Sequence, residues 1–199
     1  MPVLVSGALG TAGEDRYVTI AEHVFDAATY RRVLGHVPTS VAVVTAIDGD
    51  GNPAGMTVGS FSSVSLDPPL VGFFGDRQSR SMPRILAAGS FAVSILAESQ
   101  QEHSSAFAAR GGDRFAGVSW HLSELGSPHL DGSVAWIDCE LESAAEVGDH
   151  NAVIGRVTRL EVAGANPRPL IFFRGSLCQL DRRTLPRRGD WQLDHYADW

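Results

Sequence analysis

The chain has 199 residues, of which 44% are hydrophobic and 20% are charged, and these are the proportions of an ordinary globular protein. This length fits one domain, with or without tails, that buries a core without disulfides or metals. The net charge is −7 and all 16 basic residues are arginines, which argues against a general nucleic-acid binder because that class needs a basic face for phosphates.

The cysteines and the first residues indicate a protein that works inside the cell. Neither Cys139 nor Cys178 lies at metal-ligand spacing from a second cysteine or a histidine, so we interpret both as buried thiols in a reducing compartment. The first residues lack the basic start of a signal peptide, and no apolar run approaches the roughly 20 residues that span a bilayer. We therefore expect a cytoplasmic protein that binds no metal, no membrane and no nucleic acid.

The chain begins with residues 1–22, a Gly/Ala-rich segment without periodicity that we expect to be a flexible arm. A short helix is expected over residues 27–37, with Asp26 as its N-cap and Pro38 as the residue that ends it. The apolar residues of this helix share one face, and they are Tyr30, Val33, Leu34 and Val37.

Short apolar and β-branched stretches separated by turn residues predict a chain made mainly of strands. A turn at residues 48–52 and the DPP segment at 67–69 separate the first of them. The expected strands cover residues 40–47, 53–61, 62–66, 70–74, 91–96, 135–147, 152–162, 169–173 and 175–180.

Two more short helices are expected among these strands. Ser81 is a candidate cap for a helix that starts at Pro83 and stops at Gly89. Another helix covers about residues 100–109, and residues 111–130 are expected to be irregular.

The helices do not alternate with the strands, which argues against a doubly wound parallel sheet. Closely spaced strands joined by short turns favour an antiparallel barrel. The polar stretch after Asp181 is expected to be a surface tail. We therefore expect a mainly β domain over residues 23–181, with a few short helices, followed by a tail over residues 182–199.

The motifs of several common enzyme classes are missing. No G-x-G-x-x-G follows a strand, and there is no P-loop, G-x-S-x-G elbow or H-E-x-x-H.

Small side chains in a strand-dense region let the backbone approach a flat ligand such as a flavin ring, although an edge strand with surface serines has the same pattern. The residues with this pattern are Thr57, Gly59, Ser60, Ser62, Ser63 and Ser65.

Two other segments carry residues with possible chemistry. Residues 76–81, DRQSRS, place two hydroxyls and two guanidiniums before a helix start, which fits either a phosphate site or a solvated connector with a serine cap. Gly148, Asp149 and His150 lie between two expected strands, and alone they are typical of a hairpin turn.

Taken together, residues 25–180 resemble the flavin reductase-like family, the FMN-binding split barrels. The stretch GMTVGSFSSVSLDPPLVGF resembles the family signature, RQSRSMPRI its phosphate loop and VGDHNAVIGRV its G-D-H hairpin. PTSVAVVTA, FAVSIL, FAARGGDRFAGVSW and PLIFFRGSLCQL follow the family's order. The resemblance implies a split β-barrel of the antiparallel Greek-key type.

The resemblance also implies a role for each matching residue. Met56, Thr57, Val58, Gly59, Ser60, Phe61, Ser62 and Ser65 would hold the flavin ring, with Thr39 and Ser40 beside it. Gln78, Ser79, Arg80 and Ser81 would bind the flavin phosphate, and Phe107, Arg114 and Phe115 would line the pocket wall. The candidate catalytic residue is His150, which would position the nicotinamide and tune its reaction without acting as an obligatory base.

The family resemblance implies an NAD(P)H-dependent flavin reductase, a homodimer that supplies reduced FMN or FAD to a separate monooxygenase. A non-catalytic flavin-binding protein and a small-barrel oxidoreductase with another cofactor are the alternatives. Val58 and Gly59 depart from the alanine or asparagine that the family often has. The second arginine of the phosphate loop also makes a dinucleotide flavin acceptable.

Overall fold

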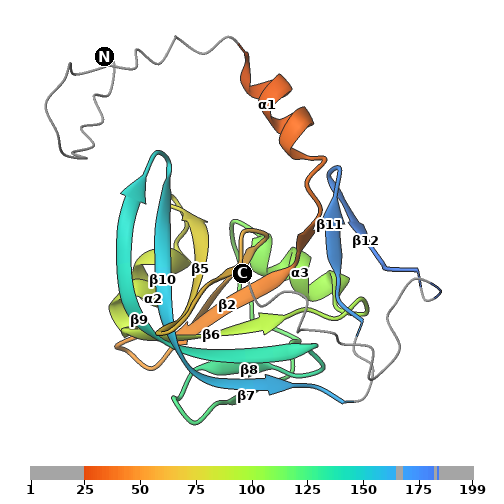
Figure 1. The fold of residues 1–199 in the computed structure, drawn as a ribbon. Coiled ribbons are helices and arrows are strands. Elements are labelled where there is room, and N and C mark those ends of the chain that lie inside the picture. The colour runs from red at the N-terminus through yellow and green to blue at the C-terminus, as the bar shows by residue number, and fades with distance from the viewer. Residues whose placement is uncertain (1–24, 165–167, 182, 184–199) are drawn as a thin grey trace, which may run out of the picture.

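The computed structural model describes residues 25–164, 168–181 and 183 (Figure 1). The expected N-terminal arm, residues 1–22, lies outside the described residues, and so does all of the expected tail except Arg183. None of the described helices is long and apolar enough to cross a membrane.

The described chain is mainly β, as predicted, and its largest part is a seven-stranded antiparallel sheet. Its two edge strands follow one another in the chain, so the sheet must curl to bring them together. At that junction the Ser60 hydroxyl donates to the Phe74 carbonyl at 3.0 Å and accepts from the Phe74 N–H at 2.9 Å. In spatial order the strands are β3 (Pro53–Val58), β2 (Ala42–Ile47), β6 (Ser90–Ile95), β9 (Ala135–Val147), β10 (His150–Val162), β5 (Pro69–Asp76) and β4 (Ser62–Leu66).

The longest hairpin joins β9 to β10 and extends beyond the barrel (Figure 1). Ile137 and Cys139 are buried near the start of β9, whereas the second half of the strand is exposed. Gly148 forms the turn with φ 61°, a conformation that favours glycine. Both strands were predicted, and β10 begins two residues earlier than expected, at His150.

The described chain also contains two small sheets that are separate from the seven-stranded sheet. β1 (Thr39–Ser40) pairs with β11 (Ile171–Phe173), which pairs with β12 (Ser176–Cys178). The expected continuous strand over residues 40–47 is thus interrupted at Val41, whose N–H donates to the Leu170 carbonyl at 3.2 Å.

The expectation that residues 111–130 are irregular was wrong for part of that range. β7 (Trp120–Leu122) and β8 (Pro128–Leu130) form a hairpin there. Each strand has only three residues, too few for an alternating pattern to stand out in the sequence.

The three short helices are present, with different ends. α1 (Ala27–Leu34) is capped as predicted, because the Asp26 carboxylate accepts from the Thr29 N–H at 2.8 Å. It ends at Gly35, three residues before Pro38. Figure 1 shows α1 projecting away from the barrel.

The predicted start of the next helix was wrong. α2 (Ser81–Ala88) begins two residues before Pro83, its N-cap residue is Arg80, and Ser81 lies inside the first turn. Ser81 does not cap the helix because its hydroxyl donates instead to the Gly55 carbonyl at 2.7 Å. The predicted stop is confirmed, since Gly89 ends the helix with φ 72°. α3 (Gln101–Ala108) agrees with the expected range.

The core is divided between the two faces of the sheet. Along β2, Val44 packs into a cluster with Phe73 and Phe91. Its neighbour Val43 packs into a second cluster with Phe107 and other residues. Alternate side chains of a strand point to opposite faces, so a strand buried on both sides reads as the continuous apolar run seen in the sequence.

Candidate functional site

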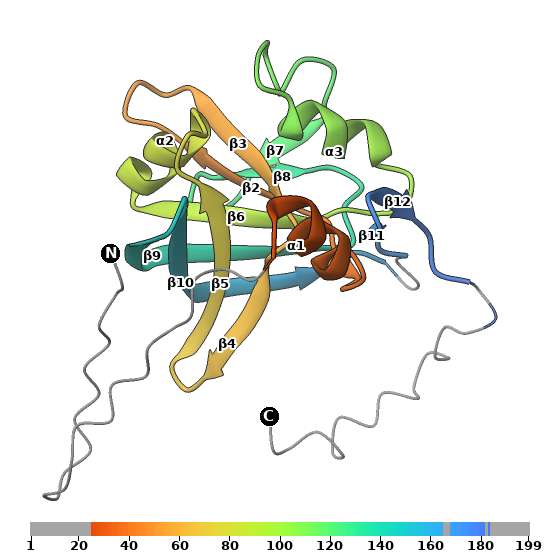
Figure 2. The same cartoon turned by 90° about the horizontal axis from the view of Figure 1, so that it is seen from above.

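Three adjoining cavities lie along β3, which runs between α2 and α3 (Figure 2). The apolar cavity, about 370 Å³, is lined by Val41, Thr57, Val58, Gly59, Ser104, Ser105, Ala108, Phe172 and Leu177. The middle cavity, about 370 Å³, is lined by Met56, Thr57, Asp76, Gln78, Ser79, Arg80, Phe107, Ala108, Arg110 and Arg114. The arginine cavity, about 290 Å³, is lined by Pro53, Ala54, Gly55, Arg80, Ser81, Arg84, Arg110, Gly111, Gly112, Asp113, Arg114 and Phe115.

The chemistry of the lining changes in one direction along these cavities. The apolar and middle cavities share Thr57 and Ala108, and the middle and arginine cavities share Arg80, Arg110 and Arg114. The three cavities therefore adjoin one another, and together they are called the trough. Its lining passes from aliphatic and aromatic carbon, through hydroxyl and amide groups, to guanidinium groups.

The apolar end of the trough is built from segments far apart in the chain. Val58 and Gly59 come from the end of β3, whereas Phe172 and Leu177 come from β11 and β12. The Thr57 hydroxyl donates to the Ser104 carbonyl at 2.9 Å and ties β3 to α3. An apolar wall beside a strand edge can hold a flat ring with polar groups along one side.

A buried hydroxyl without a partner lies beside this apolar end. The Thr39 Oγ1 atom is buried and has no hydrogen-bond partner among the described residues. A Cβ atom at Gly59 would lie 2.9 Å from it, so glycine is what lets the end of β3 pack this closely against Thr39. A buried polar atom of this kind is costly unless a ligand or water satisfies it.

The loop before α2 presents polar groups to the middle cavity. The Asp76 carboxylate accepts from the Gln78 N–H at 2.8 Å, and the Asp76 carbonyl accepts from the Ser79 N–H at 3.0 Å. The Ser79 hydroxyl in turn accepts from the Ser81 N–H at 3.3 Å. These bonds fix the loop so that Gln78, Ser79 and Arg80 all line the cavity.

One carbonyl oxygen joins β3, α2 and the loop after α3. The Gly55 carbonyl accepts from the Ser81 hydroxyl at 2.7 Å and from Arg114 Nη1 at 2.7 Å. Arg114 also donates to the Ser81 hydroxyl at 2.9 Å and to the Ala109 carbonyl at 2.7 Å. These bonds hold the Arg114 guanidinium at the border of the middle and arginine cavities.

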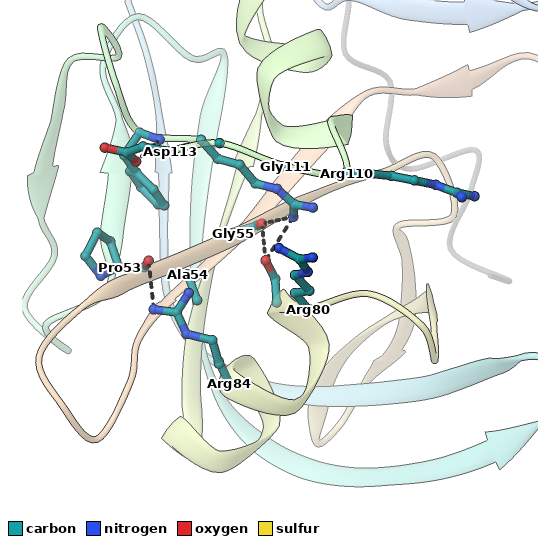
Figure 3. Close-up of a pocket in the computed structure, with 12 residues that line it drawn as sticks. Pro53, Ala54, Gly55, Arg80, Arg84, Arg110, Gly111 and Asp113 are labelled. Carbon is teal, nitrogen blue, oxygen red and sulfur yellow. Dashed lines mark hydrogen bonds between the residues drawn. The ribbon is translucent and has the colours of Figure 1, made fainter.

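Figure 3 shows the residues that line the arginine cavity. Arg80 and Arg84 project from the region of α2 toward β3, whereas the Arg110 side chain extends from the loop after α3 away from these two. Burial, and then the positive charge of Arg80, lower the pKa of the Arg114 guanidinium. The cavity is therefore a region of concentrated positive charge.

His150, the predicted catalytic residue, is the first residue of β10 after the turn of the long hairpin. It lies beside the end of β5. Its Cα partner on β5 is Asp76, which lines the middle cavity, and directly paired residues project to the same face of a sheet. His150 Nδ1 lies 2.7 Å from the Asp149 carboxylate. The hydrogen bond and the charge of His150 lower the pKa of the Asp149 carboxyl.

Most of the other predicted site residues come together, and some do not. Met56, Thr57, Val58, Gly59, Gln78, Ser79, Arg80, Ser81, Phe107, Arg114 and Phe115 line the trough. Ser62 and Ser65 lie on the edge strand β4, and neither lines one of the three cavities. Ser40, Ser60 and Phe61 lie at or near the ends of strands, and they do not line any of the three cavities either.

Sequence reasoning did not identify several residues that line the trough. Arg84 and Arg110 line the arginine cavity, and Phe172 and Leu177 line the apolar cavity. Arg110 follows the predicted helix 100–109 directly, so the arginines of FAARGGDR were a usable signal. Nothing in the sequence of β11 and β12 indicates that they reach the apolar cavity.

Comparison with known proteins shows the family to which this chain is similar. The family description "Flavin reductase like domain" matches residues 34–181. A flavin reductase of Pseudomonas putida is 48% identical over 156 residues, which are 78% of this chain and 91% of that protein. The FMN reductase (NADH) SmoA of Agrobacterium fabrum is 36% identical over 167 residues, covering 81% of this chain and 94% of SmoA.

The fold also matches a solved structure. The crystal structure of nitrilotriacetate monooxygenase component B from Mycobacterium thermoresistibile superimposes with a TM-score of 0.76 and 43% sequence identity. The match covers 83% of this chain and 93% of that one.

Proposed function

The chain belongs to the flavin reductase-like family, and from this premise we infer that it is an NAD(P)H-dependent flavin reductase. It transfers a hydride from NADH or NADPH to FMN or FAD, and the reduced flavin supplies a separate monooxygenase. The order of chemistry from the apolar cavity into the middle cavity, first aliphatic and aromatic carbon, then hydroxyl and amide groups with the guanidinium of Arg80, is the observation that carries this proposal.

The trough fits a flavin in both shape and donor set. A flavin has a flat ring with one polar edge, a hydroxylated chain and a phosphate, in that order. The apolar cavity suits the ring, and the unpartnered Thr39 hydroxyl beside Gly59 suits its polar edge. Gln78, Ser79 and Arg80 suit the phosphate.

The residues of β3 would bind the ring with main-chain groups. β3 is an edge strand of the sheet, so the main-chain groups on its outer side are not used by β2 and can face a ligand. Fixed N–H donors can stabilise negative charge without reorganising during a reaction. When bound, the flavin supplies the hydride acceptor, so the chain needs no acid–base pair of its own.

We propose that His150 positions the nicotinamide and tunes its reaction. The Asp149 carboxylate engages His150 Nδ1 at 2.7 Å and leaves Nε2 as the ring nitrogen that can face a ligand. A positioning role is enough, because holding a donor and an acceptor at about 3–3.5 Å supplies much of the rate of a transfer reaction.

We further propose that the protein is a cytoplasmic homodimer. Both cysteines are free thiols, which fits a reducing compartment, and the reaction consumes a nicotinamide coenzyme. The described surface leaves α1 and the edge strand β4 with exposed apolar side chains, among them Val33, Leu34 and Leu66, which fits an interface with a second copy.

A direct assay tests the proposed function. The purified protein is mixed with each of the four pairs of NADH or NADPH with FMN or FAD, and the absorbance of the reduced nicotinamide is followed. Oxidation that depends on both partners is expected with at least one pair. Flavin binding without oxidation in any pair would leave a flavin-storage protein and would overturn the enzyme proposal.

A further inference from the structure

The arginine cavity holds more positive charge than the described residues compensate. Four arginines line it, and Asp113 is the carboxylate that shares the lining. The Asp113 carboxylate accepts from the Phe115 N–H at 2.9 Å. Within the described ranges it forms no ion pair with any of the four.

Only one of the four arginines has a carboxylate partner in the part of the chain that the structure describes. Arg84 Nη2 lies 2.7 Å from the Asp48 carboxylate, and the same side chain donates to the Pro53 carbonyl at 3.1 Å. The Arg84 guanidinium is therefore already engaged by Asp48 and by the Pro53 carbonyl.

The other three guanidiniums have no carboxylate partner among the described residues. Arg114 donates to neutral oxygens, the carbonyls of Gly55 and Ala109 and the hydroxyl of Ser81. Arg80 and Arg110 have neither a hydrogen bond nor an ion pair from their side chains within residues 25–164 and 168–181. The positive charges of Arg80 and Arg114 repel one another, and an anion beside them would relieve the repulsion.

The same three arginines lie where the middle cavity meets the arginine cavity. A single phosphate held by Ser79 and Arg80 in the middle cavity would leave about 290 Å³ beyond Arg114 unused. The wall of that space includes Gly111 and Gly112, at which a Cβ atom would meet nothing within 4 Å, so a bulky group can approach the backbone closely. Arg80 and Ser81 of the phosphate loop also line this space.

We propose that the arginine cavity is a second phosphate subsite, that the protein therefore binds the dinucleotide flavin FAD more tightly than FMN, and that Arg110 is the residue that selects between them. The inference rests on the proposed function, because it assumes that the first phosphate in the middle cavity belongs to a flavin. A pyrophosphate spans the border that a single phosphate cannot, and bidentate guanidinium–phosphate contacts provide the affinity.

A nicotinamide dinucleotide also carries phosphates and is the other source of the same chemistry. The flavin is favoured because the cavity continues directly from the loop of Gln78, Ser79 and Arg80. The rival source predicts that loss of Arg110 changes the KM for NADH or NADPH and leaves the affinity for FAD unchanged.

Equilibrium binding without any nicotinamide tests the proposal. The dissociation constants of FAD and FMN are measured by calorimetry for the wild type and for Arg110→Ala, Arg110→Lys and Arg159→Ala. Arg110 is exposed, so its replacement is not expected to disturb folding. Arg159→Ala is the matched control, because this half-exposed arginine on β10 loses the same charge outside the three cavities.

The wild type is expected to bind FAD at least about tenfold more tightly than FMN, the effect of one charge-assisted hydrogen bond or more. Arg110→Ala should remove most of that preference by weakening FAD alone, Arg110→Lys should retain part of it, and Arg159→Ala should change neither constant. Equal affinities in the wild type, or equal weakening of both flavins by Arg110→Ala, would overturn the subsite while leaving the reductase assay intact. Binding of neither flavin would instead overturn the proposed function.

Discussion

Two threonine hydroxyls of the site region are in opposite situations. Thr45 is fully buried and its hydroxyl donates to the Pro128 carbonyl, so it stabilises the fold. The Thr39 hydroxyl is buried without a partner among the described residues. Burial of this hydroxyl costs desolvation free energy that no hydrogen bond from the described residues offsets. Contact with a bound flavin would explain why the hydroxyl is there.

Replacing each threonine by valine separates these roles. Thr39→Val should leave the free energy of unfolding of the flavin-free protein unchanged or raise it by up to about 1 kcal/mol, while weakening flavin binding about fivefold. Thr45→Val should lower the free energy of unfolding by about 1–2 kcal/mol. Denaturant titration and flavin calorimetry measure both effects. Destabilisation by Thr39→Val with unchanged flavin affinity would remove Thr39 from the site.

His150 has a close counterpart elsewhere on the surface that serves as its control. His121 Nδ1 lies 2.7 Å from the Asp131 carboxylate, as His150 Nδ1 does from Asp149. His150→Ala should slow flavin reduction by between about 10- and 100-fold, or raise the KM for NAD(P)H, through lost positioning. His121→Ala should change neither. Rapid-mixing kinetics and flavin calorimetry check this, and lost flavin binding with intact hydride transfer would contradict the assigned role.

At the scale of elements, Gly55 of β3 contacts both α2 and α3. A Cβ atom there would lie 2.6 Å from the ring of Phe107, which is fully buried and cannot move aside. The carbonyl of the same residue accepts from Ser81 and Arg114. Any shift of β3 at this point therefore also moves the border between the middle and arginine cavities.

Gly55→Ala should lower the free energy of unfolding by about 1–3 kcal/mol through overpacking and should also weaken flavin binding. Gly49→Ala is the control, because a Cβ atom at Gly49 would meet nothing within 4 Å. Thermal unfolding and flavin calorimetry of both variants give the comparison. Wild-type stability of Gly55→Ala would show that the contact between the strand and the helix is loose.

The sequence predicts the long elements better than the short ones. The strands 135–147 and 152–162 and the Asp26 cap agree with the structure because strong patterning and capping act locally. The start of α2 was misplaced because Ser81 bonds to Gly55, 26 residues away. The hairpin of β7 and β8 was missed because its strands are too short to show a period.

The residues of the candidate site also differ in whether the sequence could predict them. The residues of β3 and of the loop before α2 could be predicted, because each group is contiguous in the chain and carries its own pattern. Phe172 and Leu177 could not, since they reach the trough only through the packing of β11 and β12. Arg110 was overlooked, although it directly follows the predicted helix over residues 100–109. Positions fixed by tertiary contacts leave no local signal in one sequence.

At the scale of the whole molecule, charge is distributed unevenly. The chain has a net charge of −7, yet four of its 16 arginines line one cavity. An acidic surface repels anionic coenzymes in general, and a local cationic cavity attracts them to one place. The trough is therefore the part of the described surface best suited to a phosphorylated ligand.

The apolar face of α1 is the other large-scale feature that a single copy leaves unexplained. Tyr30, Val33 and Leu34 are each about half exposed, and no residue of α1 is buried by the described part of the chain. Figure 1 shows the helix standing away from the barrel. A helix with one apolar stripe is stable when that stripe packs on another surface, and the proposed second copy provides one.

Replacing one residue on each face of α1 tests this assembly. Val33→Glu should shift the protein from dimer to monomer at micromolar concentration, because a carboxylate would be buried in the apolar interface. Ala28→Glu adds the same charge on the opposite face of the helix, where Ala28 is exposed, and should leave the dimer intact. Light scattering during gel filtration measures the mass of each variant. A monomeric wild type would remove the homodimer proposal, and a dimer unaffected by Val33→Glu would move the interface from α1 to another surface such as β4.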